Sequence, residues 1–438
     1  MITFFSYAMI VVFMFLIIRK KLTPFSALVL VPVIFGAVGA IFGIFPKSIG
    51  DMALQGIQDT STTGIMLLFA ILYFSIMLNT GLFDPVTNFV IRVSKGDPVK
   101  ILIGTAIVAA MVSLNGDGTT TTLITCTAFL PIYKKLNLKI MNFAVIVILM
   151  NTIMNLLPWG GPTARVIAVL GINEQGILRA LMPGMIAAII YMIGVAYYMG
   201  LKERKRLGIQ VMSETELLAL TTTSTPEEEA LKRPDKIWIN AILTFVLIAM
   251  LMAGTFPSAV LFLVGTVLAL VINYRSLKEQ KQRIQVNAGD AVQVVILVLA
   301  AGIFMGIFTG TGMADALAYN LATIIPESWG NYWGLIVAVI SAPGTFFLSN
   351  DAFYFGVLPI LAEAGAKYGF TVQEIGVASL LGQAFHLLSP LVAFIYLLLN
   401  LTGLEMGGWQ KESAKWAIGI FVIFIVVSGV TSAVPLIK

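Results

Sequence analysis

A polar turn inside an otherwise apolar region decides the fold: residues 113–120 read SLNGDGTT. Apolar arms of about 15–17 residues lie on either side of this turn. A helix needs roughly 20 apolar residues to cross the hydrocarbon core of a bilayer, so these arms are short for full crossings. We therefore predict a re-entrant hairpin over about residues 101–133, whose tip stops inside the membrane, although length alone leaves two complete crossings open.

A second turn of the same kind, LSND at residues 348–351, also lies between two short apolar arms. It predicts a second hairpin over about residues 332–367. Each hairpin is followed by an apolar run of more than 30 residues that polar, Pro and Gly residues interrupt. We interpret each run as one helix that is broken inside the membrane, over about residues 139–171 and 372–402.

The composition agrees with a membrane location. Of the 438 residues, 58% are hydrophobic and 11% are charged, and the mean hydropathy is +0.95. Soluble globular chains carry roughly 25% charged residues, so the composition excludes a cytosolic enzyme, a nucleic-acid-binding module and a disordered protein. It indicates an all-α polytopic membrane protein. With one His and one Cys and no evident nucleophile–base pair, we expect no enzymatic activity.

The Lys and Arg residues predict the orientation, because positive charge gathers in cytoplasmic loops. With ten crossings and two hairpins, the loops on one side contain 22 of the 27 Lys and Arg residues. We predict that this side faces the cytoplasm, that both termini lie outside, and that residues 202–236 form a cytoplasmic linker. The net charge of +5 is then a topology signal and does not indicate a nucleic-acid partner.

The two halves of the chain resemble each other. Short motifs recur in the same order at an offset of about 228–234 residues, and Asp117 and Asp351 are one such pair. Residues 1–201 and 237–438 each contain five predicted crossings, so the second half is predicted to be upside down relative to the first. Inverted repeats with discontinuous helices are typical of secondary transporters.

The two hairpin tips are the first candidate site. An ionisable residue at membrane depth costs roughly 2.5–3.5 kcal/mol on insertion scales. Asp117 and Asp351 are therefore candidates for accepting a proton or holding a cation, and the alternative role is a helix N-cap. Gly116 and Gly118 allow close approach of a ligand to the backbone, and the following helix N-terminus attracts carboxylates.

The interruptions of the two broken helices supply further candidates. An unwound segment at membrane depth is tolerated only beside a cavity or buried in protein, and hydrogen bonds between helices are the alternative use of its polar residues. His386 is a candidate proton relay. Arg165 is predicted to bind a substrate carboxylate through its guanidinium fork, to pair with an acidic side chain, or to extend outward to the membrane interface. The full substrate-binding set is Asn115, Gly116, Gly118, Thr119, Thr120, Asn155, Gly160, Gly161, Thr163, Arg165, Ser349, Asn350, Gln383, His386 and Ser389.

Several motifs resemble one known family. They are GLFDP at 81–85, GDGTTT at 116–121, PWGGPT at 158–163, LSNDAFYFGVLP at 348–359 and HLLSPLV at 386–392. Together they are similar to the citrate–divalent metal:proton symporter family (CitMHS) of the ion-transporter superfamily, over nearly the whole chain.

This resemblance implies proton-coupled uptake of citrate across a bacterial plasma membrane, with a co-transported divalent cation such as Mg²⁺ and no bound cofactor. It implies that Asp117 and Asp351 contact the metal of the complex. Analogy with the superfamily adds a homodimer and an elevator motion of a transport domain against a scaffold. Asn115 stands where the family pattern leads us to expect Asp, which leaves open free citrate, another di- or tricarboxylate, or gluconate. A channel is a further alternative.

Overall fold

The computed structural model describes residues 1–438 apart from 46–47, 210–225, 325–326 and 436. Every regular element within these described residues is helical. Seven helices among them are long and apolar enough to cross a membrane: Pro24–Ile41, Ile49–Asn79, Pro98–Asn115, Glu174–Leu207, Glu229–Ala253, Ala291–Gly310 and Met406–Val430. The chain is therefore a polytopic, helical membrane protein, as its composition predicts.

The first half of the chain contains nine α-helices and one short 3-10 helix. They are α1 (Ile2–Ile18), α2 (Pro24–Ile41), α3 (Ile49–Asn79), α4 (Asp84–Ser94), α5 (Pro98–Val112), η1 (Ser113–Asn115), α6 (Gly118–Lys135), α7 (Ile140–Met154), α8 (Gly161–Leu170) and α9 (Glu174–Leu207).

The end of the linker forms α11 and η2, and the second half then extends from α12 to α22. These elements are α11 (Pro226–Leu231), η2 (Pro234–Lys236), α12 (Ile237–Ala253), α13 (Ser258–Asn273), α14 (Leu277–Gly310), α15 (Met313–Ile324), α16 (Glu327–Gly330), α17 (Trp333–Phe347), η3 (Ala352–Val357), α18 (Leu358–Lys367), α19 (Val372–Leu380), α20 (Gln383–His386), α21 (Ala393–Thr402) and α22 (Met406–Val430).

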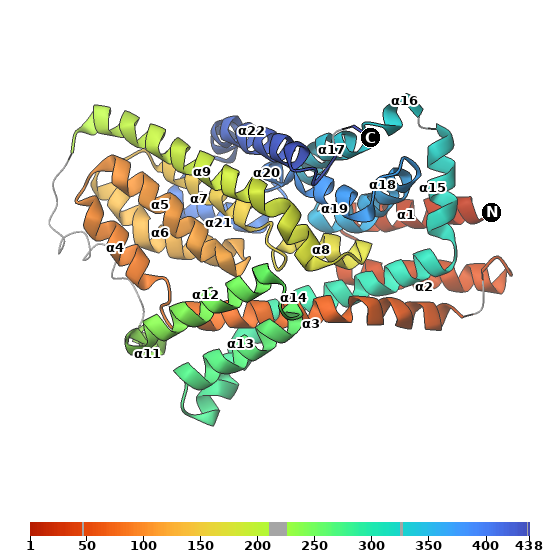
Figure 1. Ribbon diagram of the computed structural model, residues 1–438, viewed down its shortest axis with the longest axis horizontal. Helices are drawn as coiled ribbons and strands as arrows, with labels where there is room; N and C mark the ends of the chain where they lie inside the picture. The colour runs from red at the N-terminus through yellow and green to blue at the C-terminus, as the bar shows by residue number, and fades with distance from the viewer. Residues whose placement is uncertain (46–47, 210–225, 325–326, 436) are drawn as a thin grey trace.

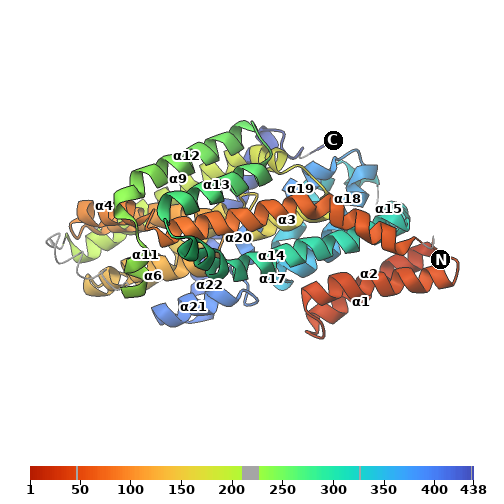
Figure 2. The same ribbon diagram turned by 90° about the horizontal axis from the view of Figure 1, so that it is seen from below.

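One order of elements occurs twice. Two helices lead to a long helix (α3 or α14), then to a short helix (α4 or α15), a helical pair, an interrupted helix and a last long helix (α9 or α22). Figures 1 and 2 place the pair α5–α6 toward one end of the long axis and the pair α17–α18 toward the other. Both chain ends lie away from the end at which α9 leads into the linker (Figure 1).

The turns and interruptions lie at the sequence positions that the polar residues predict. The first turn separates α5 from α6 through η1, and the second separates α17 from η3 and α18. The first interrupted helix is unwound over residues 155–160, between α7 and α8, and the second over 387–392, between α20 and α21. Pro158 and Pro390 in these segments cannot supply a backbone N–H to a continuing helix.

Three helices are longer than the apolar segments from which they were predicted. We expected crossings near 63–80, 181–200 and 291–309, but α3, α9 and α14 contain 31, 34 and 34 residues. At about 1.5 Å per residue they measure roughly 46–51 Å, well beyond a hydrocarbon core of about 30 Å. Hydropathy detects only the apolar part of a helix, whereas polar sequences such as that at the start of α14 form helix equally well.

The helices α3 and α14 cross in close contact at glycine residues. A Cβ atom added to Gly56 would lie 1.9 Å from the carbonyl oxygen of Gly302, and one added to Gly306 would lie 2.2 Å from that of Met52. Small residues allow helix backbones to approach closely, and in a membrane this packing replaces the hydrophobic effect as the source of association. The interface joins a long helix of the first half to a long helix of the second.

The interrupted helices lie in the interior. All twelve residues from Phe143 to Met154 in α7 are buried, as are the six from Ile375 to Leu380 in α19. A helix that is apolar on every side is buried in protein or faces lipid along its whole surface. Because these two are covered by other helices, the first unwound segment is positioned inside the molecule, and the second is buried except at Pro390 and Leu391, which are exposed.

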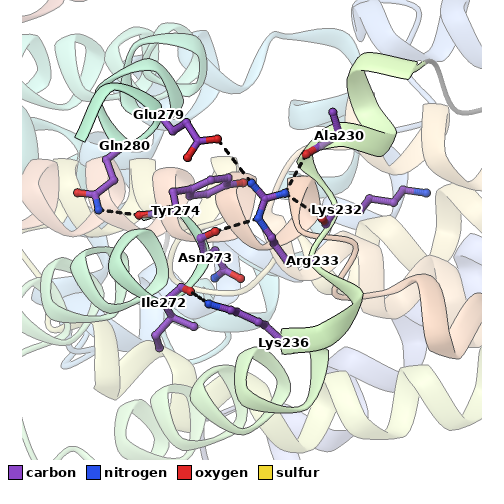
Figure 3. Close-up of polar contacts among 9 residues, drawn as sticks. All are labelled: Ala230, Lys232, Arg233, Lys236, Ile272, Asn273, Tyr274, Glu279 and Gln280. Carbon is purple, nitrogen blue, oxygen red and sulfur yellow. Dashed lines mark hydrogen bonds and ion pairs between the residues drawn. The ribbon is translucent and has the colours of Figure 1, made fainter. Parts of the chain in front are cut away.

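The end of the linker is fastened to both halves, and Figure 3 shows its contacts with the second half. Arg233 Nε donates a hydrogen bond to the carbonyl oxygen of Asn273 at the end of α13 (2.9 Å), and Lys236 donates to that of Ile272. The backbone N–H of Arg233 donates to the carbonyl of Thr80, after α3 (3.0 Å). These contacts satisfy carbonyls that a helix leaves unpaired at its C-terminus. Residues 210–225 of the predicted linker lie outside the described residues.

Candidate functional site

The tip of the first hairpin is held by Asp117, which is the N-cap of α6. Its carboxylate accepts hydrogen bonds from the backbone N–H of Thr119 (3.2 Å), from that of Thr120 (2.7 Å) and from the Thr120 hydroxyl. Asn115 Oδ1 accepts from the N–H of Asp117 (2.9 Å). Gly116 has φ of +76°, and a Cβ there would lie 3.1 Å from the carbonyl oxygen of Trp159. The tip is thus a tight turn in which a side chain at 116 would strain the backbone and crowd Trp159.

Behind this tip, Asn151 of α7 ties the two arms of the hairpin together. Its Nδ2 donates to Ser113 Oγ (3.1 Å) and to Thr121 Oγ1 (3.3 Å). Its own Oδ1 and the hydroxyl of Thr122 are buried and make no hydrogen bond within the described part of the chain. The tip therefore rests on a polar cluster in the interior, with unused hydrogen-bonding capacity.

The first unwound segment is shaped by its own polar side chains. The N–H of Gly161 donates to Asn155 Oδ1 (3.2 Å), and Thr163 Oγ1 donates to the carbonyl of Leu156 (2.9 Å). A Cβ at Gly160 would lie 2.0 Å from the carbonyl oxygen of Asn155. Trp159 Nε1 donates to the carbonyl of Leu114 in the hairpin turn (2.7 Å). These contacts hold the hairpin tip directly against the unwound segment.

The tip of the second hairpin is built differently. Here Ser349 Oγ accepts from the N–H of Ala352 (3.1 Å), and Asp351 makes no capping hydrogen bond. Asp351 Oδ1 instead accepts from Nε of Arg165, in α8 of the first half, at 2.7 Å. Nη1 of Arg165 donates to the carbonyl of Gly161 (2.8 Å). Two aspartates at equivalent sequence positions therefore have different partners.

Helix α20 and the second unwound segment that follows it are tied to the second hairpin. Gln383 Nε2 donates to Asn350 Oδ1 (3.1 Å) and to the hydroxyl of Tyr354 (2.6 Å). Ser389 Oγ donates to the carbonyl of Phe346 (2.6 Å). His386 Nδ1 lies 2.7 Å from the carbonyl oxygen of Thr345. A carbonyl only accepts, so this nitrogen carries the proton, and Nε2 of the neutral ring is the acceptor.

The two halves meet through these tips. The ring of Phe394, at the start of α21, lies over the Cα of Gly118, where an added Cβ would be 2.2 Å from it. The first hairpin tip thus contacts the second interrupted helix. The second hairpin tip contacts the first interrupted helix through Arg165. No hydrogen bond joins Asp117 to Asp351 in the structure described, and the Thr119 side chain is exposed.

The described residues include no group of three or more His, Cys, Asp or Glu side chains that could hold a metal ion. A cation carried with a carboxylate substrate is cargo, and the substrate itself supplies part of its ligands. Asp117 uses its oxygens in capping and Asp351 faces a guanidinium. The metal contacts predicted for these two residues therefore need a change of partner at each carboxylate.

Sequence reasoning missed two contact residues: Tyr354, which binds Gln383, and Phe394, whose ring covers Gly118. Asn151, which braces the first tip, and Thr121 are outside the predicted substrate-binding set, although the sequence indicates both as polar contact residues. Asn151 stands four residues before Asn155 and so shares its helix face, which is a detectable signal. Tyr354 and Phe394 are aromatic residues in apolar surroundings, and no sequence pattern separates them from ordinary core residues.

The chain is similar in sequence to known transporters over most of its length. Residues 10–382 match the sequence model of the CitMHS family, described as "Citrate transporter". A Bacillus subtilis (strain 168) protein named "Citrate transporter" is 47% identical over 97% of this chain and 98% of its own length. From the same strain, "Mg(2+)/citrate complex secondary transporter" is 39% identical over the full length of both chains.

A solved structure shares the fold. The crystal structure of the Alcanivorax borkumensis YdaH transporter, reported for its unusual topology, superposes with a TM-score of 0.56 over 88% of this chain and 89% of that one, at 12% identity. The identity is low, so this likeness concerns the fold alone. The sequence matches, by contrast, extend over most of the chain at high identity. The protein is thus a membrane transporter and not an enzyme, and it belongs to the CitMHS citrate transporter family.

Proposed function

We propose that this protein is a secondary active transporter that takes up citrate, alone or as a complex with a divalent cation, together with protons or another coupling cation. The observation that carries the proposal is the position of Arg165. Its guanidinium lies between the first unwound segment and the second hairpin tip, inside an apolar molecule, and is still 19% exposed. An arginine at such a junction is suited to a carboxylate, which it binds in a planar fork.

The names of two relatives support the choice of substrate. One is a citrate transporter and the other carries a complex of Mg²⁺ and citrate. We propose that backbone N–H groups at the hairpin tips, together with Asn155, Gln383 and Arg165, bind the carboxylates. Asp117 and Asp351 exchange the proton or contact the cation, and His386 offers Nε2 as an acceptor nearby.

The wider mechanism is also a proposal. The element order that occurs twice, with hairpins toward opposite ends of the long axis (Figure 1), supports two inverted repeats of five crossings. We propose that the hairpins and interrupted helices form the moving part of an elevator, that the remaining helices form the scaffold of a homodimer, and that both termini lie outside a bacterial plasma membrane.

Counterflow in proteoliposomes tests the proposed function. Vesicles loaded with unlabelled citrate should accumulate labelled citrate, and external unlabelled citrate should compete, with and without Mg²⁺. Stronger competition in the presence of Mg²⁺ would identify the complex as the substrate. Gluconate and other di- and tricarboxylates serve as rival competitors. The proposal is refuted if citrate, at either cation condition, neither exchanges nor competes while the protein is folded in the vesicles.

A further inference from the structure

The two hairpin tips use their aspartates in different ways, and this difference is informative. Asp117 accepts hydrogen bonds from its own helix at Thr119 and Thr120. Asp351 leaves capping to Ser349 and reaches Arg165 of the other half, 186 residues away in the chain. Helix geometry thus does not require the carboxylate of Asp351. The carboxylate of Asp351 instead pairs with the guanidinium of Arg165, a group that can also bind a substrate carboxylate.

The equivalent place in the first hairpin has no such pair. At the offset of about 228–234 residues, the counterpart of Arg165 lies within 393–399, which reads AFIYLLL and contains no basic residue. The side chain that contacts the first tip from this segment is Phe394, whose ring covers Gly118. Among the described residues, an ion pair therefore holds the second tip and not the first, and its guanidinium belongs to a proposed substrate-binding residue.

The pair is accessible to a small ligand. The side chains of Arg165 and Asp351 are 19% and 17% exposed, so solvent reaches both. Arg165 uses Nε for Asp351 and Nη1 for the carbonyl of Gly161, and no hydrogen bond of Nη2 occurs among the described residues. A carboxylate that enters can therefore bind at Nη2 and then replace Asp351 at Nε, which completes the two-bond fork.

We propose that Asp351 and a substrate carboxylate compete for Arg165, so that Asp351 occupies the site in the empty carrier and substrate binding displaces it. This inference rests on the proposed function, since it assigns Arg165 to the substrate. Displacement removes the counter-ion of Asp351. The released carboxylate then takes up one cation, either a proton, which makes it a neutral acid, or the divalent ion that enters with the substrate. Because coupling free energies are reciprocal, cation uptake at Asp351 strengthens substrate binding.

A double-mutant cycle on the purified full-length protein tests this competition. Citrate affinity is measured by titration calorimetry for the wild type, Asp351→Asn, Arg165→Lys and the double variant, once with EDTA and once with Mg²⁺. Asp351→Asn should bind citrate roughly tenfold more tightly, because the internal competitor has lost its charge. In the Arg165→Lys background, whose ammonium cannot form the fork, the same change should alter affinity less than threefold.

The titrations with EDTA and with Mg²⁺ identify the cation that Asp351 takes up. Wild-type protein titrated in EDTA, in buffers of different ionisation enthalpy, should take up one more proton per citrate than Asp351→Asn. If Mg²⁺ is the partner, the difference appears instead as a stronger Mg²⁺ dependence of wild-type affinity. Asp97→Asn is the matched control, because Asp97 pairs with Arg204 away from the tips, and its citrate affinity should equal that of the wild type.

Several results would overturn the inference. One is an Asp351→Asn affinity equal to or weaker than that of the wild type. Another is the same gain in both Arg165 backgrounds, which would indicate general charge repulsion. Should the variants not fold, a citrate-loaded wild-type structure decides: the pair must be separated, and a retained hydrogen bond between Arg165 Nε and Asp351 Oδ1 refutes competition. If the folded wild type binds no citrate, the proposed function fails instead.

Discussion

Replacing Asp117 separates helix capping from cation coupling. Asp117→Asn removes the charge but keeps a side-chain oxygen, and Asn and Asp are equally good N-caps. The Asp carboxylate accepts from the N–H groups of Thr119 and Thr120 and from the Thr120 hydroxyl. Asn replaces one acceptor oxygen with a donor, so the expected loss is at most about 1 kcal/mol of unfolding free energy. Asp117→Ala removes every acceptor, and the expected loss is about 2 kcal/mol.

Transport should respond quite differently. If the carboxylate of Asp117 takes part in coupling, Asp117→Asn should lower gradient-driven citrate accumulation at least tenfold, although its stability stays near that of the wild type. Citrate–citrate counterflow, which needs no net cation movement, should fall much less. The measurements are thermal unfolding of the purified protein, followed by both uptake modes in the same batch of proteoliposomes.

A second N-cap provides the control. Asn173 caps α9 by accepting from the N–H groups of Gln175 (2.8 Å) and Gly176 (3.1 Å), outside the candidate site. Asn173→Ala should lower stability as capping predicts and leave coupled uptake unchanged. The reasoning is refuted if Asp117→Asn accumulates citrate at the wild-type rate, because Asp117 would then be only a cap.

Three further predictions concern other parts of the structure. His386→Ala removes the hydrogen bond between α20 and the carbonyl of Thr345 in the second hairpin, and should reduce citrate uptake at least tenfold at unchanged membrane levels; wild-type uptake would contradict this role. Gly302→Ala places a Cβ 2.3 Å from a backbone oxygen of α3, so α3 and α14 must separate by about 1 Å and the thermal midpoint should fall. Gly194→Ala, with nothing within 4 Å of the new Cβ, should not lower the midpoint, because Ala favours helix over Gly. Arg233→Ala uncaps the carbonyl of Asn273 at the end of α13 and should lower the unfolding free energy by about 1–2 kcal/mol, measured by denaturant or heat, with citrate affinity unaltered.

Much of the architecture follows from a simple contrast in the sequence. A polar turn or a Pro–Gly cluster is conspicuous in an apolar background, and so the positions of both hairpins and both interruptions can be predicted. Helix ends are harder to predict, because the polar extensions of α3, α9 and α14 carry no hydropathy signal. The membrane depth of the hairpin tips and the division into repeats remain predictions.

The sequence indicates which polar residues are candidates for the site, but it does not indicate which residues they contact. Arg165 was expected to bind either a substrate or an acid, and sequence separation alone could not select Asp351 across 186 residues. The motif similarity of Asp117 and Asp351 suggested one common role. Their different surroundings come from tertiary contacts, since Ser349 takes over capping in the second tip and α8 brings a guanidinium to it.

The ion pair between Arg165 and Asp351 also bears on which orientation the proposed carrier prefers when it is empty. In a perfectly symmetric inverted repeat, the inward-open and outward-open states would have equal free energies. Here the second tip is held by an ion pair with Arg165, whereas the first is covered by the ring of Phe394. If the two orientations of the proposed elevator differ in this contact, they are unequal in energy and the unloaded protein prefers one side. Such a bias would set how much of the carrier waits for substrate on each face of the membrane.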